Sequence, residues 1–308
     1  MKDMRSAFVE ALLEEARQNS SIVLITGDLG FGVLEEFAAE LPNQFVNAGI
    51  AEQSMMGMAA GLASTGKRVF VYSIGNFPTL RCLEQIRNDV CLMNNPVVIV
   101  AVGAGYAYGA QGYTHHALED VSVLRSLPNM EICSPSDSFE TRELTKFLAN
   151  TKIPAYLRLG KVAEEIPEYV ENEFQFGKFR ELAPGANGTI LFTGSLASIA
   201  LEARQELLAK GLEVAVCSVP FISNLDLPYL ERAVTKGLIV TIEEQVIRGG
   251  FGSAVLEAIS SSGLHAAVKI IGATQEHLSL IGNQQFLRNS NGINSETIIE
   301  NFNFYLAA

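Results

Sequence analysis

Short, continuous apolar runs alternate along this chain with stretches in which apolar residues recur at helical spacing. A short apolar run between turn residues is typical of a strand buried on both faces, as in parallel sheets covered by helices. The runs of the first half are Ile22–Ile25, Phe45–Ala48, Val69–Tyr72, Val97–Val102, Met130–Cys133 and Ala155–Leu159. The helical stretches are Met4–Ala16, Glu52–Ser64, Thr79–Met93, Asp120–Ser126 and Asp137–Asn150. The alternation predicts an α/β fold with a mostly parallel sheet.

The alternation is interrupted once, which predicts two domains. An acidic segment dotted with aromatic residues lies between Lys161 and Pro184, and a second alternation follows it. Its apolar runs are Thr189–Thr193, Val214–Val219, Leu238–Ile242 and Val268–Ile271, and its helical stretches are Leu196–Lys210, Tyr229–Thr235 and Gly252–Ser261. The length of 308 residues fits two domains of about 150 residues each. We expect a three-layer domain at 1–165, a linker at 166–185 and a second three-layer domain at 186–308.

Charge and cysteine usage exclude several classes of protein. The chain has 22 Lys and Arg against 34 Asp and Glu, and this net charge of −12 disfavours nucleic acid, whose phosphates need cationic side chains. The four cysteines show no CxxC spacing, so neither a zinc site nor a redox pair is indicated. Neither a signal peptide nor an apolar stretch of membrane-spanning length is present. We expect a soluble, cytoplasmic protein with no nucleic-acid partner, no membrane contact and no metal ligands of its own.

Glu52 is the first candidate for chemistry, because it stands where a predicted strand ends and a helix begins. An acid in the first turn of a helix is favoured by the helix dipole by roughly 0.3–1 kcal/mol, and this alone accounts for its presence. The helix that follows, Met55–Ala63, is apolar all round and therefore predicted to be buried. A carboxylate beside it is desolvated, and such an acid can be tuned for proton transfer.

A glycine-rich segment at 103–116 follows the Val97–Val102 run and ends in His115 and His116. Glycines after a strand indicate either a flexible loop or a backbone that approaches a ligand closely. A zinc site is disfavoured, because adjacent histidines point different ways and the cysteines are scattered. One histidine acting as a proton or hydrogen-bond donor is the alternative. The glycines at 27–32 and 249–252 lack the order of a dinucleotide-binding motif.

Several motifs in this order resemble the pyrimidine-binding and C-terminal domains of transketolase-like thiamine diphosphate enzymes, over nearly the whole chain. The motifs of the first domain are Gly49–Gln53, Phe77–Asp89, Gly112–Asp120, Arg125–Met130, Pro135–Asp137 and Tyr156–Gly160. In the second domain, Glu243–Ala254 is similar to the family's final domain, with Gln245 where a histidine is frequent. The resemblance implies the C-terminal subunit of a split, two-component transketolase.

The resemblance implies a role in cofactor binding for four residues. Glu52 matches the glutamate that hydrogen-bonds N1′ of the aminopyrimidine ring and so favours the tautomer that removes the thiazolium C2 proton. Phe77 matches the aromatic residue that stacks on this ring, with Tyr72 as a weaker candidate. Ile50, in the same motif as Glu52, is assigned to the cofactor-binding residues.

The resemblance also implies substrate contacts. His115 matches the active-site histidine near the substrate's hydroxyls and carbonyl, and Arg158 matches an arginine that grips a sugar phosphate. Gln111 stands where transketolases usually carry an acid, and Gly103 where many carry a histidine. Since an amide still donates and accepts hydrogen bonds, we expect transfer chemistry with an altered sugar preference. Ala51, where an arginine is usual, further distances the chain from a standard transketolase.

The family's diphosphate and metal motif has no counterpart here. That motif is Gly-Asp-Gly followed by an asparagine, whereas Gly27–Asp28 is followed by Leu29, and Asn94 comes 66 residues after Asp28, much further than in the motif. We therefore expect a partner, an N-terminal transketolase subunit that binds the diphosphate and Mg²⁺ (or Ca²⁺), in an α2β2 heterotetramer. The helix at Met55–Met58 is a candidate for the shared surface, and ordinary core is the alternative.

The resemblance implies transfer of a two-carbon ketol unit from a ketose phosphate to an aldose phosphate. The alternatives are a pyruvate-using relative, similar to 1-deoxyxylulose-5-phosphate synthase or to the β subunit of a 2-oxo acid dehydrogenase, and a non-catalytic regulatory subunit. Gln111 and Gly103 favour a specialised sugar pathway over central metabolism. The sequence leaves the donor and acceptor sugars open.

Overall fold

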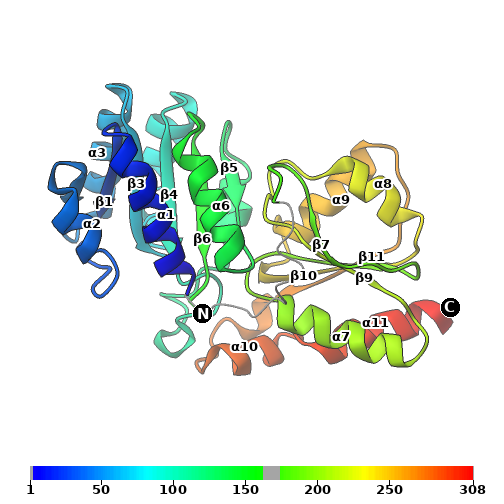
Figure 1. The fold of residues 1–308 in the computed structure, drawn as a ribbon. Helices are drawn as coiled ribbons and strands as arrows, with labels where there is room; N and C mark the ends of the chain where they lie inside the picture. The colour runs from blue at the N-terminus through cyan, green and yellow to red at the C-terminus, as the bar shows by residue number, and fades with distance from the viewer. Residues whose placement is uncertain (1–2, 162–173, 308) are drawn as a thin grey trace.

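The computed structural model describes residues 3–161 and 174–307, and these form two α/β domains that lie side by side (Figure 1). The first domain is built on a six-stranded sheet in which all neighbouring strands are parallel. The strands are β1 (Ile22–Thr26), β2 (Phe45–Asn47), β3 (Arg68–Ile74), β4 (Val97–Val102), β5 (Glu131–Cys133) and β6 (Ala155–Leu159). Their order is β2-β1-β3-β4-β6-β5, and the apolar runs of β1 and β4 are buried on both faces.

Helices cover both faces of this sheet. They are α1 (Met4–Gln18), α2 (Glu35–Glu40), α3 (Glu52–Ser64), α4 (Leu83–Gln85), α5 (Asp120–Leu124) and α6 (Ser138–Ala149). Helices α1 and α6 share a core with Phe70 and Tyr72, whereas α3 packs with Val69 and Val71 on the opposite face. The helix expected at 79–93 is a 3₁₀ turn at 80–82, then α4, then a π-helical segment at 86–92.

The second domain has a five-stranded sheet in the order β11-β10-β8-β9-β7. Its strands are β7 (Arg180–Ala183), β8 (Thr189–Phe192), β9 (Ala215–Ser218), β10 (Ile239–Val246) and β11 (Val268–Ala273). Its helices are α7 (Ala197–Ala209), α8 (Leu227–Val234), α9 (Phe251–Ser261), α10 (Gln284–Ser290) and α11 (Ser295–Ala307). Figure 1 shows α7 and α11 on one side of this sheet and α8 and α9 on the other. The expected α/β architecture with mostly parallel sheets is confirmed.

The linker expected at 166–185 needs a correction at its end. Residues 166–173 lie outside the described residues, but residues 180–183 form β7, which pairs antiparallel with β9. The strand was hidden because its short run includes Arg180, whose charge reads as a surface residue. In the structure Arg180 is buried and donates to Asp137 Oδ2 at 2.7 Å and to Glu140 Oε1 at 3.3 Å.

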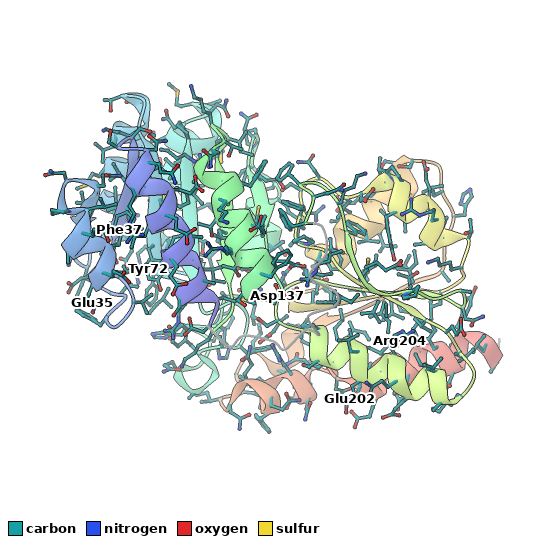
Figure 2. All side chains as sticks on the ribbon, in the orientation of Figure 1. Glu35, Phe37, Tyr72, Asp137, Glu202 and Arg204 are labelled. Carbon is teal, nitrogen blue, oxygen red and sulfur yellow. The ribbon has the colours of Figure 1, made fainter. Side chains whose placement is uncertain are left out.

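These contacts place a buried ionic cluster where the two domains meet. Asp137, labelled in Figure 2, begins α6, and Glu140 also accepts a hydrogen bond from Ser218 of β9 at 3.1 Å. Burial, together with the neighbouring Asp137 carboxylate, raises the pKa of Glu140. The domains are therefore joined by fixed polar contacts as well as by apolar packing. None of the helices in the described ranges has both the length and the apolar character needed to cross a membrane.

Candidate active site

Three loops that follow parallel strands carry the residues singled out by the sequence. Residues 48–51 follow β2, residues 75–82 follow β3 and residues 103–117 follow β4. The carboxyl ends of parallel strands lie along one edge of a sheet, which is where ligands bind in folds of this kind. Glu52, Phe77 and His115 therefore lie at the same edge.

Side-chain contacts link these three residues through a fourth, Arg81. Glu52 is only 3% exposed, and its Oε2 accepts a hydrogen bond from Arg81 Nη1 at 2.6 Å. The Cζ atom of Arg81 lies 4.5 Å from the centroid of the Phe77 ring. The rings of Phe77 and His115 meet edge to face, with centroids 5.4 Å apart. The arrangement combines a buried carboxylate, an aromatic face and an imidazole.

The sequence explains why Glu52 lies there. Gly49 adopts a φ of +70°, a left-handed turn that glycine enters without strain, and the chain then starts α3 at Glu52. Met55 and Met56 are fully buried, whereas Met58 is 42% exposed. The helix at 55–58 is therefore core on one side, and only its other side can meet a partner.

The two adjacent histidines have different surroundings. His115 is half-buried, contacts Phe77, and has Nδ1 3.0 Å from the hydroxyl of Thr114. His116 is fully buried, lies edge-on to Tyr106, and has Nε2 3.3 Å from the carbonyl of Gly109. Burial lowers the pKa of His116. His115 is thus the histidine beside Glu52 and Phe77.

The two departures from the usual family pattern lie on the glycine-rich loop. A Cβ at Gly103 would come within 2.1 Å of the Tyr108 ring, so Tyr108 fills the space that a side chain at 103 would need. Gln111 is exposed at the end of a 3₁₀ turn, four residues before His115. The loop therefore accommodates a glycine at 103 by construction.

Tyr72 does not lie where the cofactor role requires. It alternates with Val71 along β3 and faces the α1 side of the sheet, where it stacks on Phe8 with ring centroids 6.0 Å apart. Its side chain is 1% exposed (labelled in Figure 2). Because Glu52 and α3 belong to the opposite face, the expectation that Tyr72 contacts the cofactor is corrected.

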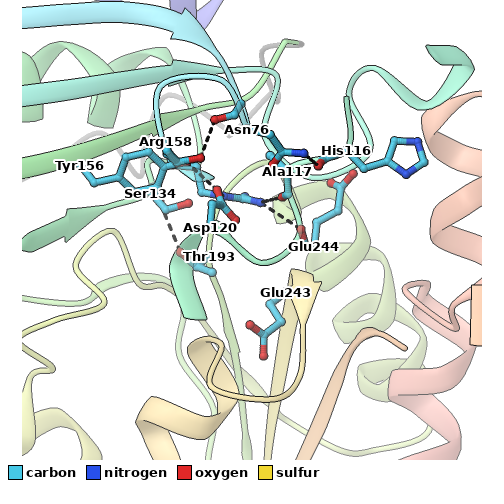
Figure 3. A network of polar contacts seen from close by, with 12 residues as sticks. Asn76, His116, Ala117, Asp120, Ser134, Tyr156, Arg158, Thr193, Glu243 and Glu244 are labelled. Carbon is cyan, nitrogen blue, oxygen red and sulfur yellow. Dashed lines mark hydrogen bonds and ion pairs between the residues drawn. The ribbon is translucent and has the colours of Figure 1, made fainter. Parts of the chain in front are cut away.

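Arg158 also departs from its expected role. It is 2% exposed, and its Nε donates to Asp120 Oδ2 at 2.7 Å (Figure 3). Its Nη2 donates to the carbonyls of Ala117 at 2.7 Å and Glu244 at 3.1 Å. A guanidinium so enclosed cannot reach a sugar phosphate, so that expectation is corrected. Arg158 instead ties the His115 loop to β10 of the second domain.

Glu244 and Arg81 were missed in the sequence. Glu244 is 5% exposed and accepts hydrogen bonds from the backbone N–H of Tyr106 at 2.7 Å and from Arg288 Nη2 at 2.6 Å. Its neighbour Glu243 accepts from the N–H groups of Phe251 and Gly252, and burial raises its pKa to about 7. Two adjacent acids inside an otherwise apolar strand run were the available signal, because acids are rarely buried without a partner.

Metal ligands do not cluster in the described part of the chain, where no group of three or more His, Cys, Asp or Glu side chains could hold an ion. The buried cysteines act as small apolar residues. Burial, with the Glu52 carboxylate nearby, raises the pKa of Cys82 to about 12. The chemistry available at this edge is therefore that of one acid, one imidazole and an aromatic face.

Comparison with known proteins covers both domains. Residues 1–163 match the family described as "Transketolase, pyrimidine binding domain", and residues 177–298 match "Transketolase, C-terminal domain". An apulose-4-phosphate transketolase subunit of Phocaeicola vulgatus is 40% identical over 299 residues, which are 96% of this chain and 94% of that protein. The putative transketolase C-terminal section of Methanocaldococcus jannaschii is 37% identical, over 88% of this chain and 86% of that one.

Enzymes of greater length and a solved structure complete the comparison. 1-Deoxy-D-xylulose-5-phosphate synthase 1 of Geobacter sulfurreducens is 37% identical over 98% of this chain, which corresponds to 48% of the synthase. A structure titled "Split gene transketolase, inactive beta4 tetramer" superposes with a TM-score of 0.91 and 32% identity, covering 100% of this chain and 99% of that one. The chain belongs to the transketolase family and consists of its pyrimidine-binding domain followed by its C-terminal domain.

Proposed function

We propose that this chain is the C-terminal subunit of a thiamine diphosphate-dependent transketolase that transfers a two-carbon ketol unit from a ketose phosphate to an aldose phosphate. The observation that carries the proposal is the slot between Glu52 and Phe77. One flat group, the Arg81 guanidinium, spans it by bonding the carboxylate through its edge and contacting the ring through its face. An aminopyrimidine ring has the same shape and the same two modes of contact.

The residues of the slot have separate roles in the proposed reaction. Glu52 holds the proton at N1′ of the aminopyrimidine ring, and its burial strengthens this hydrogen bond. Phe77 orients the ring by stacking, and His115, at its edge, donates a hydrogen bond to the sugar. Thiamine diphosphate, when bound, supplies the electron sink that the transfer requires.

Replacing His115 by Ala is expected to lower kcat/KM of the reconstituted enzyme by about 10²–10⁴, the usual contribution of a positioned proton or hydrogen-bond donor. His265, exposed in the second domain, is the matched control, and His265→Ala should leave kcat/KM unchanged. Steady-state kinetics with a sugar phosphate donor measures both variants. A wild-type value for His115→Ala would remove this residue from the site.

A separate partner chain is the second part of the proposal. We infer that an N-terminal subunit holds the diphosphate and Mg²⁺ (or Ca²⁺) and completes an α2β2 enzyme in the cytoplasm. The names of two relatives, a transketolase subunit and a transketolase C-terminal section, describe components of divided enzymes. Large apolar side chains are also exposed in the loops after β1, β2 and β3, at Phe31, Ile50 and Leu80. Exposed apolar groups around one sheet edge are typical of a protein–protein interface.

Calorimetry tests the divided site. The isolated chain is expected to bind thiamine diphosphate weakly, with no increase on adding Mg²⁺, because the diphosphate contributes nothing without its metal ligands. Adding the N-terminal subunit should produce tight, Mg²⁺-dependent binding. Tight Mg²⁺-dependent binding by this chain alone would contradict the divided site.

The donor distinguishes the proposal from a pyruvate-using enzyme. Apulose 4-phosphate enters as a donor to test because two relatives are named for it. The reconstituted enzyme should transfer from apulose 4-phosphate or xylulose 5-phosphate and leave pyruvate unused. Turnover of pyruvate alone would favour the deoxyxylulose phosphate synthase alternative, which the 37% identity to such a synthase keeps in view.

A further inference from the structure

Arg81 lies where the proposed function places the aminopyrimidine ring. Its Nη1 is 2.6 Å from Glu52 Oε2, and its Cζ is 4.5 Å from the centroid of the Phe77 ring. Guanidinium groups stack on aromatic rings and bond carboxylates through their edges. The guanidinium therefore satisfies both contacts that the cofactor ring would make.

The exposures of the two partners show how the contact works. The carboxylate of Glu52 is 3% exposed, whereas the Arg81 side chain is 47% exposed. A buried carboxylate without a hydrogen-bond donor is costly, and Arg81 supplies a donor from the solvent side. Arg81 thus covers Glu52 in the manner of a ligand that enters from outside.

The backbone of Arg81 is held while its side chain projects to solvent. Its carbonyl accepts a hydrogen bond from Gln53 Nε2 at 3.1 Å, and the next residue, Cys82, is fully buried. The segment is therefore anchored on both sides of the contact. A change of side-chain rotamer is enough to move the guanidinium away from Glu52 without displacing the loop.

We propose that Arg81 occupies the place of the aminopyrimidine ring in the unliganded subunit and that the cofactor displaces its side chain toward solvent. The inference rests on the proposed function, which assigns Glu52 and Phe77 to the cofactor. Arg81 is then a positioning residue that keeps Phe77 and Glu52 apart and prepared, and that competes with the ring it resembles. Removing the competitor should make the ring bind more tightly.

A calorimetric titration with the free pyrimidine moiety of the cofactor, 4-amino-5-hydroxymethyl-2-methylpyrimidine, tests the competition in this chain alone. Arg81→Ala is expected to bind this compound about tenfold more tightly than wild type, a change of about 1.4 kcal/mol. Arg81→Lys, which keeps the charge but loses the flat group, should fall between them. Arg87→Ala removes an exposed arginine that pairs only locally, with Asn88, and should match wild type.

Nuclear magnetic resonance supplies a readout that a structural role would not move. The arginine Nε signal missing from the Arg81→Ala spectrum identifies Arg81, and the pyrimidine compound should shift this signal in wild type. In the reconstituted enzyme, Arg81→Ala should lower the thiamine diphosphate concentration for half-saturation by a similar factor. An unchanged or higher concentration would overturn the inference.

The two proposals fail in different ways. If Arg81→Ala binds the pyrimidine compound no better than wild type while Glu52→Gln loses activity, Arg81 is no competitor and the proposed function stands. If Glu52→Gln is fully active and no variant binds the compound, the cofactor assignment itself falls, and the inference with it.

Discussion

Glu52→Gln is expected to lower turnover of the reconstituted enzyme by about a hundredfold or more while the fold stays intact, which is the range for loss of a proton-transferring acid. Glutamine keeps the size of the side chain and can still accept from Arg81, so the start of α3 is undisturbed. An amide cannot take up or release the proton at N1′. The acid is therefore lost and the hydrogen-bond geometry is kept.

Steady-state kinetics and thermal unfolding by circular dichroism separate the two effects. Glu84→Gln serves as the control, since Glu84 is exposed on α4 close to the same edge of the sheet. This control should have the kcat of wild type. Full activity of Glu52→Gln, with cofactor bound, would refute the assignment of the acid.

Asp120→Asn is expected to lower the free energy of unfolding by about 3–5 kcal/mol, the usual cost of leaving one charge of a buried pair without its partner. Asp120 is fully buried and accepts from Arg158 Nε at 2.7 Å and from the Tyr156 hydroxyl at 2.5 Å. In the variant, the positive charge of Arg158 stays enclosed without an acid. The loss should therefore be large although the two side chains have nearly the same shape.

Urea unfolding of the chain, followed by circular dichroism, measures this loss. Glu257→Gln breaks the exposed pair of Glu257 with Arg125 and should cost no more than about 1 kcal/mol, because water screens such pairs. The double variant Asp120→Asn, Arg158→Met should regain part of the stability lost by Asp120→Asn, since it removes the enclosed charge. A cost below about 1 kcal/mol for Asp120→Asn would show that the pair is not needed for stability.

The same network explains why part of the site could not be predicted. A motif match assigns Arg158 to a sugar phosphate because arginine suits that task, but the match carries no information on burial. The structure encloses Arg158 between Asp120, the Ala117 carbonyl and β10 of the second domain. Contacts between domains depend on packing that no local pattern records. The same holds for Glu244, whose partners Tyr106 and Arg288 lie far from it in the chain.

Tyr72 shows a second limit of sequence reasoning. In a strand buried on both faces, apolar runs contain no polar residues to mark which face is which. The register of β3 alone decides that Tyr72 faces Phe8 and that Val71 faces α3. For Glu52 no such ambiguity exists, because a strand end followed by a helix start places its side chain at the ligand edge.

The sequence by itself determined the two α/β domains, the boundaries of most strands and the edge of the sheet that carries Glu52, Phe77 and His115. These follow from hydrophobic periodicity and from the rule that parallel strands end on one side, and both are local in the chain. The tertiary structure alone decided that β7 joins the second sheet, that Arg158 is enclosed and that Arg81 spans the slot between Glu52 and Phe77. These depend on burial and on contacts between distant segments, which are set only when the chain has packed.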